Sequence, residues 1–272
     1  MNEQRVPFSV ALLSGGIAGL TVDVSLFPID TIKTRLQSRE GFVKCGGFRG
    51  IYRGLGAASL GSVPGAAVFF CTYELTKSIG AAHLSTKYDP LVQMAGASVG
   101  EILACFVRVP VEVVKQRAQA TRQRSFSILR ATLQTEGVRG VYRGYLSTVL
   151  REVPFSFLQF PLWEFLKRSW STHQGGPVDA WQSGICGAVS GGTAAAITNP
   201  LDVVKTRIIL ASQNSETAKG NVRFALVEVF RQEGFRGLFA GVLPRVMWIS
   251  IGGAIFLGAY EKVKITLMSG GL

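Results

Sequence analysis

PIDTIKTRLQ, which spans residues 28–37, is the most informative stretch of the chain, because two close copies of it follow. PVEVVKQRAQ occupies residues 110–119 and PLDVVKTRII occupies residues 200–209. All three copies share the order Pro-x-acid-x-x-Lys-x-Arg. A pattern of this length that recurs at near-regular intervals indicates an internal repeat. The chain is therefore predicted to be a triplicated unit.

Two further phrases recur in step with the first one. GGFRGIYRG, EGVRGVYRG and EGFRGLFAG end at Gly54, Gly144 and Gly241. An aromatic residue followed by Glu-x-x-Lys comes later in each copy, at residues 73–77, 163–167 and 260–264. With boundaries near His83 and Gly175, the predicted repeats are residues 1–83, 84–175 and 176–272.

The composition favours a membrane protein. Of the 272 residues, 47% are hydrophobic and 17% are charged, whereas soluble domains carry roughly 25% charged residues. Six apolar stretches are each long enough to cross about 30 Å of hydrocarbon as a helix. They are residues 8–27, 55–73, 91–109, 145–163, 181–199 and 242–260. We therefore predict an all-α membrane protein, with six transmembrane helices in a threefold pseudosymmetric barrel around a central cavity.

The basic residues are concentrated in three alternate loops. Nineteen of the 29 Lys and Arg residues lie at residues 33–53, 115–143 and 205–236. This is the positive-inside pattern of multi-span proteins, so the three loops are expected on one side of the membrane and both termini on the other. Amphipathic spacing at residues 126–134 and 222–232 predicts short surface helices, and we expect one in each loop. Nucleic-acid binders gather bases on a soluble face with interleaved aromatics, so no nucleic-acid partner is expected.

Metal and cofactor chemistry is not expected. The four cysteines show no Cys-x-x-Cys spacing and the chain has only two histidines, which makes a metal site improbable. A membrane enzyme such as a methyltransferase would need a glycine-rich loop after a strand, and no GxGxxG follows a strand-like segment. We therefore expect that the protein is not an enzyme. Apolar sequence begins by Phe8, so any targeting signal is expected to be internal.

The acid and the lysine of each Pro-x-acid-x-x-Lys phrase lie three residues apart and project from one helical face. An ion pair within one helix is the ordinary interpretation. Three copies at the ends of symmetry-related helices favour a ring, in which each acid binds the lysine of a neighbouring repeat. The members of this basic-end ring are Asp30, Lys33, Glu112, Lys115, Asp202 and Lys205. A far-end ring on the opposite side would consist of Glu74, Lys77, Glu164, Lys167, Glu261 and Lys264, and two rings provide the two gates that alternating access needs.

Together the three phrases resemble the signature of the mitochondrial carrier family over essentially the whole chain. The resemblance implies location in the mitochondrial inner membrane, basic loops in the matrix, and cardiolipin bound near the Tyr/Phe-Arg-Gly turns. It also implies that the glutamine nine residues after each proline braces the matrix gate, which is the basic-end ring. Gln37 and Gln119 match, whereas Ile209 does not. Gly46 also stands where the other two repeats have glutamate, and both departures predict a weaker closure on the matrix side.

Charged residues inside the predicted spans are functional candidates, because each costs about 2.5 to 3.5 kcal/mol on insertion scales. They are Asp23, Glu101, Arg108, Arg151, Glu152 and Arg245. Glu101, Cys105 and Arg108 share one helical stripe. Asp23 precedes its proline by five residues, as Cys105 does, so the stripe is expected to face the cavity in both repeats.

Other cavity residues follow from the resemblance and from their position. The family resemblance implies substrate contact points at Gly61, at Arg151 with Glu152, and at Trp248. Phe155 and Gln159 are expected to line the cavity. Structural roles stay open beside these, namely a buried pair of Arg108 and Glu101, a partnership of Glu152 with Arg151 alone, an interface position for Trp248 and a core position for Phe155.

The candidate charges also bear on the cargo. Three acids and three arginines cancel, whereas a carrier of nucleotides or tricarboxylates should show a cationic excess, so the residues indicate a small zwitterion or cation. Residues 102–119, 142–163 and 249–260 further resemble members of the family that carry S-adenosylmethionine. That resemblance implies exchange for S-adenosylhomocysteine. A carrier of another zwitterionic or cationic amino-acid-like solute and a non-transporting scaffold on the same fold remain alternatives.

Overall fold

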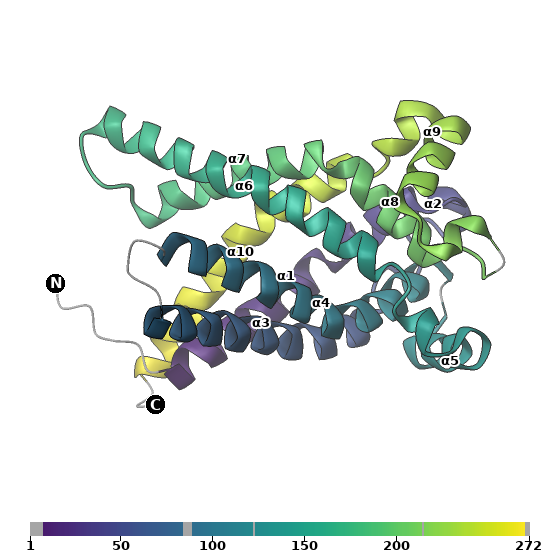
Figure 1. The fold of residues 1–272 in the computed structure, drawn as a ribbon, viewed down its shortest axis with the longest axis horizontal. Helices are drawn as coiled ribbons and strands as arrows, with labels where there is room; N and C mark the ends of the chain where they lie inside the picture. The colour runs from purple at the N-terminus through teal and green to yellow at the C-terminus, as the bar shows by residue number, and fades with distance from the viewer. Residues whose placement is uncertain (1–7, 84–88, 122, 214, 270–272) are drawn as a thin grey trace.

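The structure is a computed structural model that describes residues 8–83, 89–121, 123–213 and 215–269. These residues form six long helical segments and several short ones (Figure 1). The long segments are α1 (Phe8–Gln37), α3 (Leu55–His83), α4 (Asp89–Thr121), α6 (Tyr145–Gln174), α7 (Ala180–Ile197) followed by α8 (Asn199–Leu210), and α10 (Val242–Ser269). The short ones are α2 (Gly41–Lys44), α5 (Ser125–Val141), η2 (Glu216–Lys219) and α9 (Val222–Leu238). The all-α prediction is confirmed.

The long helices form a closed ring. Each packs on the next in chain order from α1 through α3, α4, α6 and α7 to α10, and α10 returns to pack along α1. The short helices α2, α5 and α9 gather at one end of the molecule, and the start of α1 and the end of α10 lie together at the other end (Figure 1). We refer to the end with α2, α5 and α9 as the basic end.

The helices extend beyond the predicted apolar stretches. α1 and α4 continue through Pro28 and Pro110, so the residues of the repeated phrase lie on the same long helices as the apolar stretches. In the third repeat the helix is interrupted instead. α7 ends at Ile197 and α8 begins at Asn199, which places Pro200 in the first turn of a helix, where its missing N–H costs no hydrogen bond.

The short helices at the basic end agree with two of the predicted amphipathic segments. α5 covers residues 126–134 and α9 covers residues 222–232. Both bend near their ends at a glycine, Gly137 with φ 63° and Gly234 with φ 62°, a backbone region that is open to glycine but costly for other residues. α2 is a single turn, which reflects the shorter loop of the first repeat.

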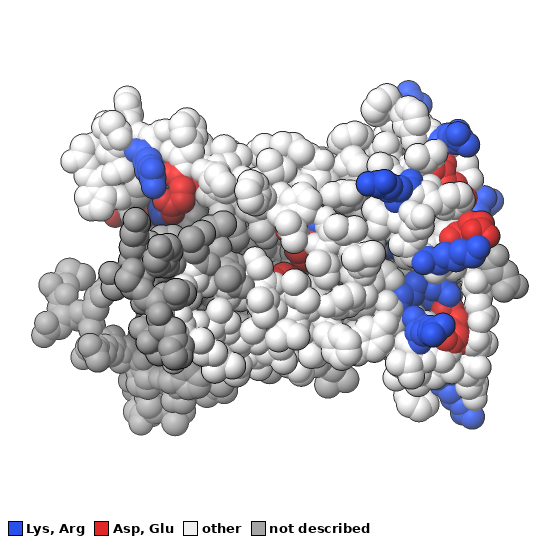
Figure 2. Space-filling view, viewed as in Figure 1, with Lys and Arg blue, Asp and Glu red and all other residues white. Residues whose placement is uncertain are grey.

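Charged side chains are distributed unevenly along the molecule. Figure 2 shows Lys and Arg gathered at the basic end, a smaller charged group at the opposite end, and a middle band of the same face that is largely without them. Within the described parts of the chain, no helix meets the combined standard of length and hydropathy used to recognise a membrane span.

Candidate functional site

Three ion pairs close the interior near the basic end. Each pair joins an acid of one repeat to a lysine of a neighbouring repeat, so that the three run in a cycle. They are Lys115 with Asp30 at 2.8 Å, Lys205 with Glu112 at 2.6 Å and Lys33 with Asp202 at 2.7 Å. The predicted inter-repeat pairing of the basic-end ring is confirmed.

The ring residues are largely removed from water. The side chains of Asp202 and Lys205 are each 4% exposed. Removing one partner of a buried ion pair leaves a charge without compensation and costs about 3 to 5 kcal/mol. Separating these pairs without providing other partners for their charges would therefore be costly.

Two glutamines brace the ring as the resemblance implies. Gln37 donates from Nε2 to Oδ2 of Asp202 at 2.8 Å, and Gln119 donates from Nε2 to Oδ2 of Asp30 at 3.0 Å. Thr206 donates from Oγ1 to Oε1 of Gln37 at 2.8 Å and thereby orients the amide. Each brace crosses the same boundary between repeats as the ion pair that it supports.

The boundary between the second and third repeats, where Lys205 pairs with Glu112, has no such glutamine. Ile209 is fully buried and packs in an apolar cluster with Val109 and Val113. The carboxylate of Glu112 instead accepts a hydrogen bond at 2.9 Å from Nε2 of Gln116, which lies one turn further along α4. Gln116 is not among the site residues predicted from the sequence. The sequence signal that could have identified it is that the other two repeats have threonine, Thr34 and Thr206, at the equivalent position.

Gln116→Leu is expected to destabilise the protein by about 1.5 to 3 kcal/mol, because it removes a hydrogen bond to a charged group. The midpoint of thermal unfolding of the purified protein should fall by several degrees, since about 1 kcal/mol corresponds to roughly 2 to 4 °C in a chain of this size. Gln134→Leu, at an exposed position of α5, is the matched control and should leave the midpoint nearly unchanged. Equal midpoints for the two variants would show that Gln116 does not support the ring.

The arginine of each repeated phrase forms a second set of contacts between repeats. Arg35 donates from Nε to the carbonyl of Gln119 at 2.9 Å, and Arg117 donates from Nε to that of Ile209 at 3.2 Å. Arg207 likewise donates from Nε to the carbonyl of Gln37. Each arginine therefore contacts the backbone of the next repeat at the level of the glutamine position, just beyond the ring.

The same arginines anchor their own loops. Arg117 pairs with Glu136 at 3.0 Å and Arg207 pairs with Glu233 at 2.8 Å. In the first repeat, where Gly46 replaces this glutamate, Arg35 donates to backbone carbonyls at the end of the loop. They belong to Gly47, Arg49 and Gly50. Backbone acceptors thus take the place of the acid, and Arg35 is fully buried.

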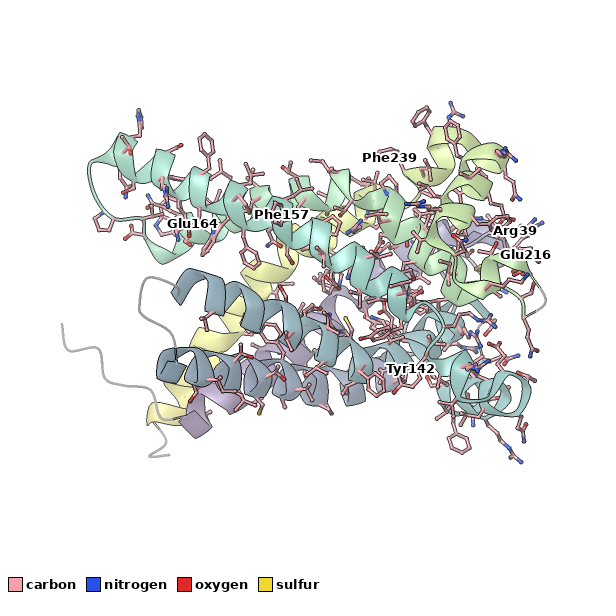
Figure 3. All side chains as sticks on the ribbon, in the orientation of Figure 1. Arg39, Tyr142, Phe157, Glu164, Glu216 and Phe239 are labelled. Carbon is pink, nitrogen blue, oxygen red and sulfur yellow. The ribbon has the colours of Figure 1, made fainter. Side chains whose placement is uncertain are left out.

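The far-end ring is described at one of its three positions. Lys167 pairs with Glu164 of its own helix at 3.2 Å and lies over the ring of Trp163, 3.9 Å from its centre. Figure 3 shows Glu164 on α6 near the end opposite Arg39 and Glu216. The other members lie outside the described side chains: Glu74, Lys77, Glu261 and Lys264. The described pair does not join two repeats in this structure.

Two neighbouring hollows, which share the lining residue Asp23, lie between the two ends. The larger, of about 850 Å³, is lined by predicted residues of three helices, namely Asp23, Phe155, Gln159 and Trp248, and by Trp163. The smaller, of about 200 Å³, lies directly on the basic-end ring and is lined by Asp23, Arg108, Arg151 and Glu152 together with Glu112, Lys115 and Lys205. Asp23 lines both hollows, so it lies where the two adjoin.

The arginines of the smaller hollow are already paired with two of the three acids. Arg108 contacts Glu101 at 2.6 Å and Glu152 at 3.6 Å. Arg151 also contacts Glu152. Among the described residues, Asp23 has no such ion-pair partner. It is therefore the acid of this group whose charge is not compensated by a described ion pair.

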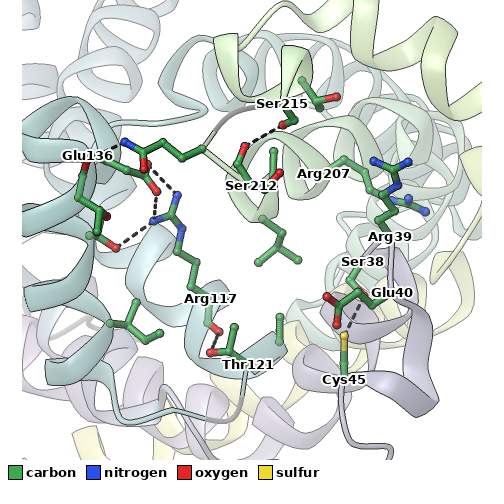
Figure 4. Close-up of a pocket in the computed structure, with 18 of the residues that line it drawn as sticks. Ser38, Arg39, Glu40, Cys45, Arg117, Thr121, Glu136, Arg207, Ser212 and Ser215 are labelled. Atoms are coloured by element: carbon green, nitrogen blue, oxygen red, sulfur yellow. Dashed lines mark hydrogen bonds and ion pairs between the residues drawn. The ribbon is translucent and has the colours of Figure 1, made fainter.

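A third hollow lies on the other side of the basic-end ring. It measures about 480 Å³ and is lined by α4, α5, α8 and α9, by the segment that follows α1, and by the loop between α8 and α9. Figure 4 shows Arg117 and Glu136 joined across one side of it, and Ser38 hydrogen-bonded to Cys45 on another. The basic-end ring thus lies between this hollow and the smaller one.

Comparison with known proteins identifies the family. Residues 4–83, 86–174 and 176–271 each match the family described as Mitochondrial carrier protein. The chain belongs to the mitochondrial carrier family. Family membership makes this carrier a mitochondrial transport protein, and the three matched segments agree with the threefold repeat inferred from the motifs.

Named relatives of the carrier are similar over nearly their whole length. It is 58% identical to the mitochondrial S-adenosylmethionine carrier protein of Danio rerio, over 97% of this chain and 99% of the relative. It is 55% identical to the protein of the same name from Mus musculus, over 97% of both chains. The S-adenosylmethionine mitochondrial carrier protein homolog of Drosophila melanogaster is 51% identical, over 94% of this chain and 92% of the relative.

Not every predicted site residue of the carrier lines a hollow. Glu101 reaches the smaller hollow only through its pair with Arg108. Arg245 is buried in the wall, where it donates to the hydroxyl of Thr198 at 2.9 Å and lies 3.8 Å from Asp202. Gly61 lies outside the residues whose surroundings are described. Trp163 also lines the larger hollow. It belongs to a repeated phrase but is not among the cavity residues predicted from the sequence.

Proposed function

We propose that this carrier moves S-adenosylmethionine across the mitochondrial inner membrane into the matrix, in exchange for S-adenosylhomocysteine. The observation that carries the proposal is Asp23, an acid without an ion-pair partner among the described residues, at the junction of the two hollows. S-adenosylmethionine has an ammonium, a sulfonium and a carboxylate. Asp23 and Glu152 suit the positive centres, and Arg108 suits the carboxylate.

The larger hollow suits the remaining part of this cargo. Trp248, Phe155 and Trp163 line it, and aromatic rings of this kind pack against a planar base by offset stacking. The names of the relatives point to the same cargo, since they are S-adenosylmethionine carriers.

We further propose that the carrier crosses the membrane several times, with the basic end in the matrix and both termini toward the intermembrane space. The middle band with few charges supports this placement (Figure 2), as does the positive-inside pattern of the three loops. The closed basic-end ring and the described far-end pair, which is confined to one helix, support a state whose cavity opens toward the intermembrane space. Exchange then alternates between the two rings.

An anionic lipid, cardiolipin by family resemblance, is proposed at the turn that precedes α6. A hollow of about 650 Å³ lies there, lined by Arg139, Tyr142, Arg143 and Lys219 at the N-terminus of α6. Basic side chains and the free backbone N–H groups of a helix N-terminus together favour a phosphate group.

The cargo is tested by uptake of labelled S-adenosylmethionine into liposomes that contain the purified carrier. Internal S-adenosylhomocysteine is expected to stimulate uptake strongly, because it shares the adenosine, ammonium and carboxylate and differs by a methyl group and the sulfonium charge. ATP, lysine and ornithine serve as alternative internal solutes, and empty liposomes without protein provide the background. Exchange driven by lysine or ornithine but not by S-adenosylhomocysteine would favour a carrier of another amino-acid-like solute. Chemical conversion of the label inside the liposomes would favour an enzyme.

A further inference from the structure

Asp202 differs from the other two acids of the basic-end ring in its surroundings. Besides Lys33 and Gln37, two arginines approach it. Nε of Arg151 lies 3.7 Å from Oδ1 and Nε of Arg245 lies 3.8 Å from Oδ2. Both distances exceed hydrogen-bonding range, so the two arginines lie next to Asp202 while Lys33 remains its bonded cation. The described ion pairs of Asp30 and Glu112 involve one lysine each.

Arg151 lies between the cargo site and the ring. One end of its guanidinium contacts Glu152, which lines the smaller hollow. Its Nε is buried and makes no hydrogen bond to another described residue. Oε1 of Glu152 lies 3.6 Å from Arg108 as well, so Glu152 would not be left without a cation if Arg151 moved away.

We propose that Arg151 couples cargo binding to opening of the basic-end ring. A positive centre of the cargo binds Glu152 and releases Arg151, which moves onto Oδ1 of Asp202. The arginine then compensates the charge of the carboxylate, so that Lys33 can leave Oδ2. The inference rests on the proposed function, because it requires a cargo with a positive centre.

The exchange of partners explains which part of the ring opens first. A buried carboxylate that loses its only cation is strongly destabilised. Asp202 avoids that state, because Arg151 and Arg245 are already beside it, and the ring accordingly opens first between α1 and α8. Arg151 is a positioning residue for this step, and the cargo acts on the ring through it.

The first test separates binding from turnover. Arg151→Gln should lower the maximal exchange rate in liposomes by about tenfold or more while the Kd for labelled S-adenosylmethionine changes by less than about threefold. Arg151→Lys keeps a positive charge and should retain more of the rate than the Gln variant does. Thermal unfolding of the purified variants checks that they fold, and if the Gln variant does not fold, the comparison is made with the Lys variant. Equal losses of affinity and rate would assign Arg151 to cargo binding alone and overturn the coupling.

The second test uses the ring itself. If the task of Arg151 is to let Lys33 leave Asp202, then Lys33→Gln should raise the exchange rate of the Arg151→Gln protein severalfold. Lys115→Gln removes a matched lysine from a ring pair that Arg151 does not approach, and it should give no such rescue. Equal rescue by both lysine variants would overturn the assignment, because it would show only that a weaker ring opens more easily.

These outcomes are independent of the identity of the cargo. If the wild-type carrier failed to exchange S-adenosylmethionine, the proposed function would be wrong. The rate, affinity and rescue comparisons would then be made with whichever basic solute the wild-type carrier exchanges. An unchanged exchange rate in Arg151→Gln would still reject the coupling.

Discussion

Replacing Lys115 with Asp is expected to reduce exchange at least a hundredfold. The variant places a second carboxylate against Asp30, where the lysine now lies 2.8 Å from Oδ2. Breaking a buried pair costs about 3 to 5 kcal/mol, and each 1.4 kcal/mol is about tenfold in an equilibrium constant. The closed ring should therefore be almost unpopulated. Exchange of labelled cargo in liposomes measures the loss.

The matching rescue distinguishes the two kinds of pairing. Asp30→Lys in the Lys115→Asp background reverses the pair between repeats and should recover a large part of the exchange. Glu112→Lys in the same background reverses the charges within one helix and should recover little. We choose this pair rather than Lys33 with Asp202, because a lysine at position 202 would meet Arg151 and Arg245. Better recovery from the same-helix reversal would contradict the ring.

Asp23→Asn should lower the efficiency of uptake by about 10- to 100-fold, because a charge-assisted contact with the cargo is worth about 1.5 to 3 kcal/mol. The substitution keeps the size of the side chain and removes its charge. Asp23 is half-buried and lines both hollows, so the affinity for a cationic cargo should fall while the fold is retained. Uptake and thermal unfolding are measured on the same preparation.

Glu216→Gln is the control for Asp23→Asn. Glu216 forms an exposed pair with Lys219 at the basic end, and exposed pairs contribute little to stability, so exchange should stay close to that of the wild type. Normal uptake by Asp23→Asn would remove Asp23 from the cargo site. A variant that unfolds would instead show that Asp23 supports the structure.

Much of the architecture could be predicted because the chain is repeated. A ten-residue phrase in three copies implied three equivalent helices, and equivalence made a ring more plausible than three separate pairs. The starts of α3, α6 and α10 at Leu55, Tyr145 and Val242 coincide with the predicted apolar stretches. Each follows directly after a glycine that ends a repeated phrase.

The departures from symmetry could not be predicted in the same way. Gln116 supports Glu112 because Ile209 leaves the boundary without an amide, and this substitution depends on a contact that no single repeat contains. The position of Arg245 in the wall beside Asp202 likewise depends on how α10 packs near the start of α8. Hydropathy and spacing identified Arg245 as a charge inside a helix, but they do not distinguish a cavity surface from a wall.

The anchoring of Arg35 by backbone carbonyls makes the three repeats unequal in their tolerance of mutation. Arg117 and Arg207 each depend on a glutamate, and one codon change can remove that partner. The carbonyl oxygens that hold Arg35 belong to the main chain and persist whatever side chains the loop carries. In the first repeat, mutations that change the backbone conformation of the loop are therefore the damaging ones. The loop needs a positive φ at Gly47 (55°) and at Gly50 (63°). Other side chains of the first loop can therefore be replaced without loss of the contacts to Arg35, as long as those two glycines are kept.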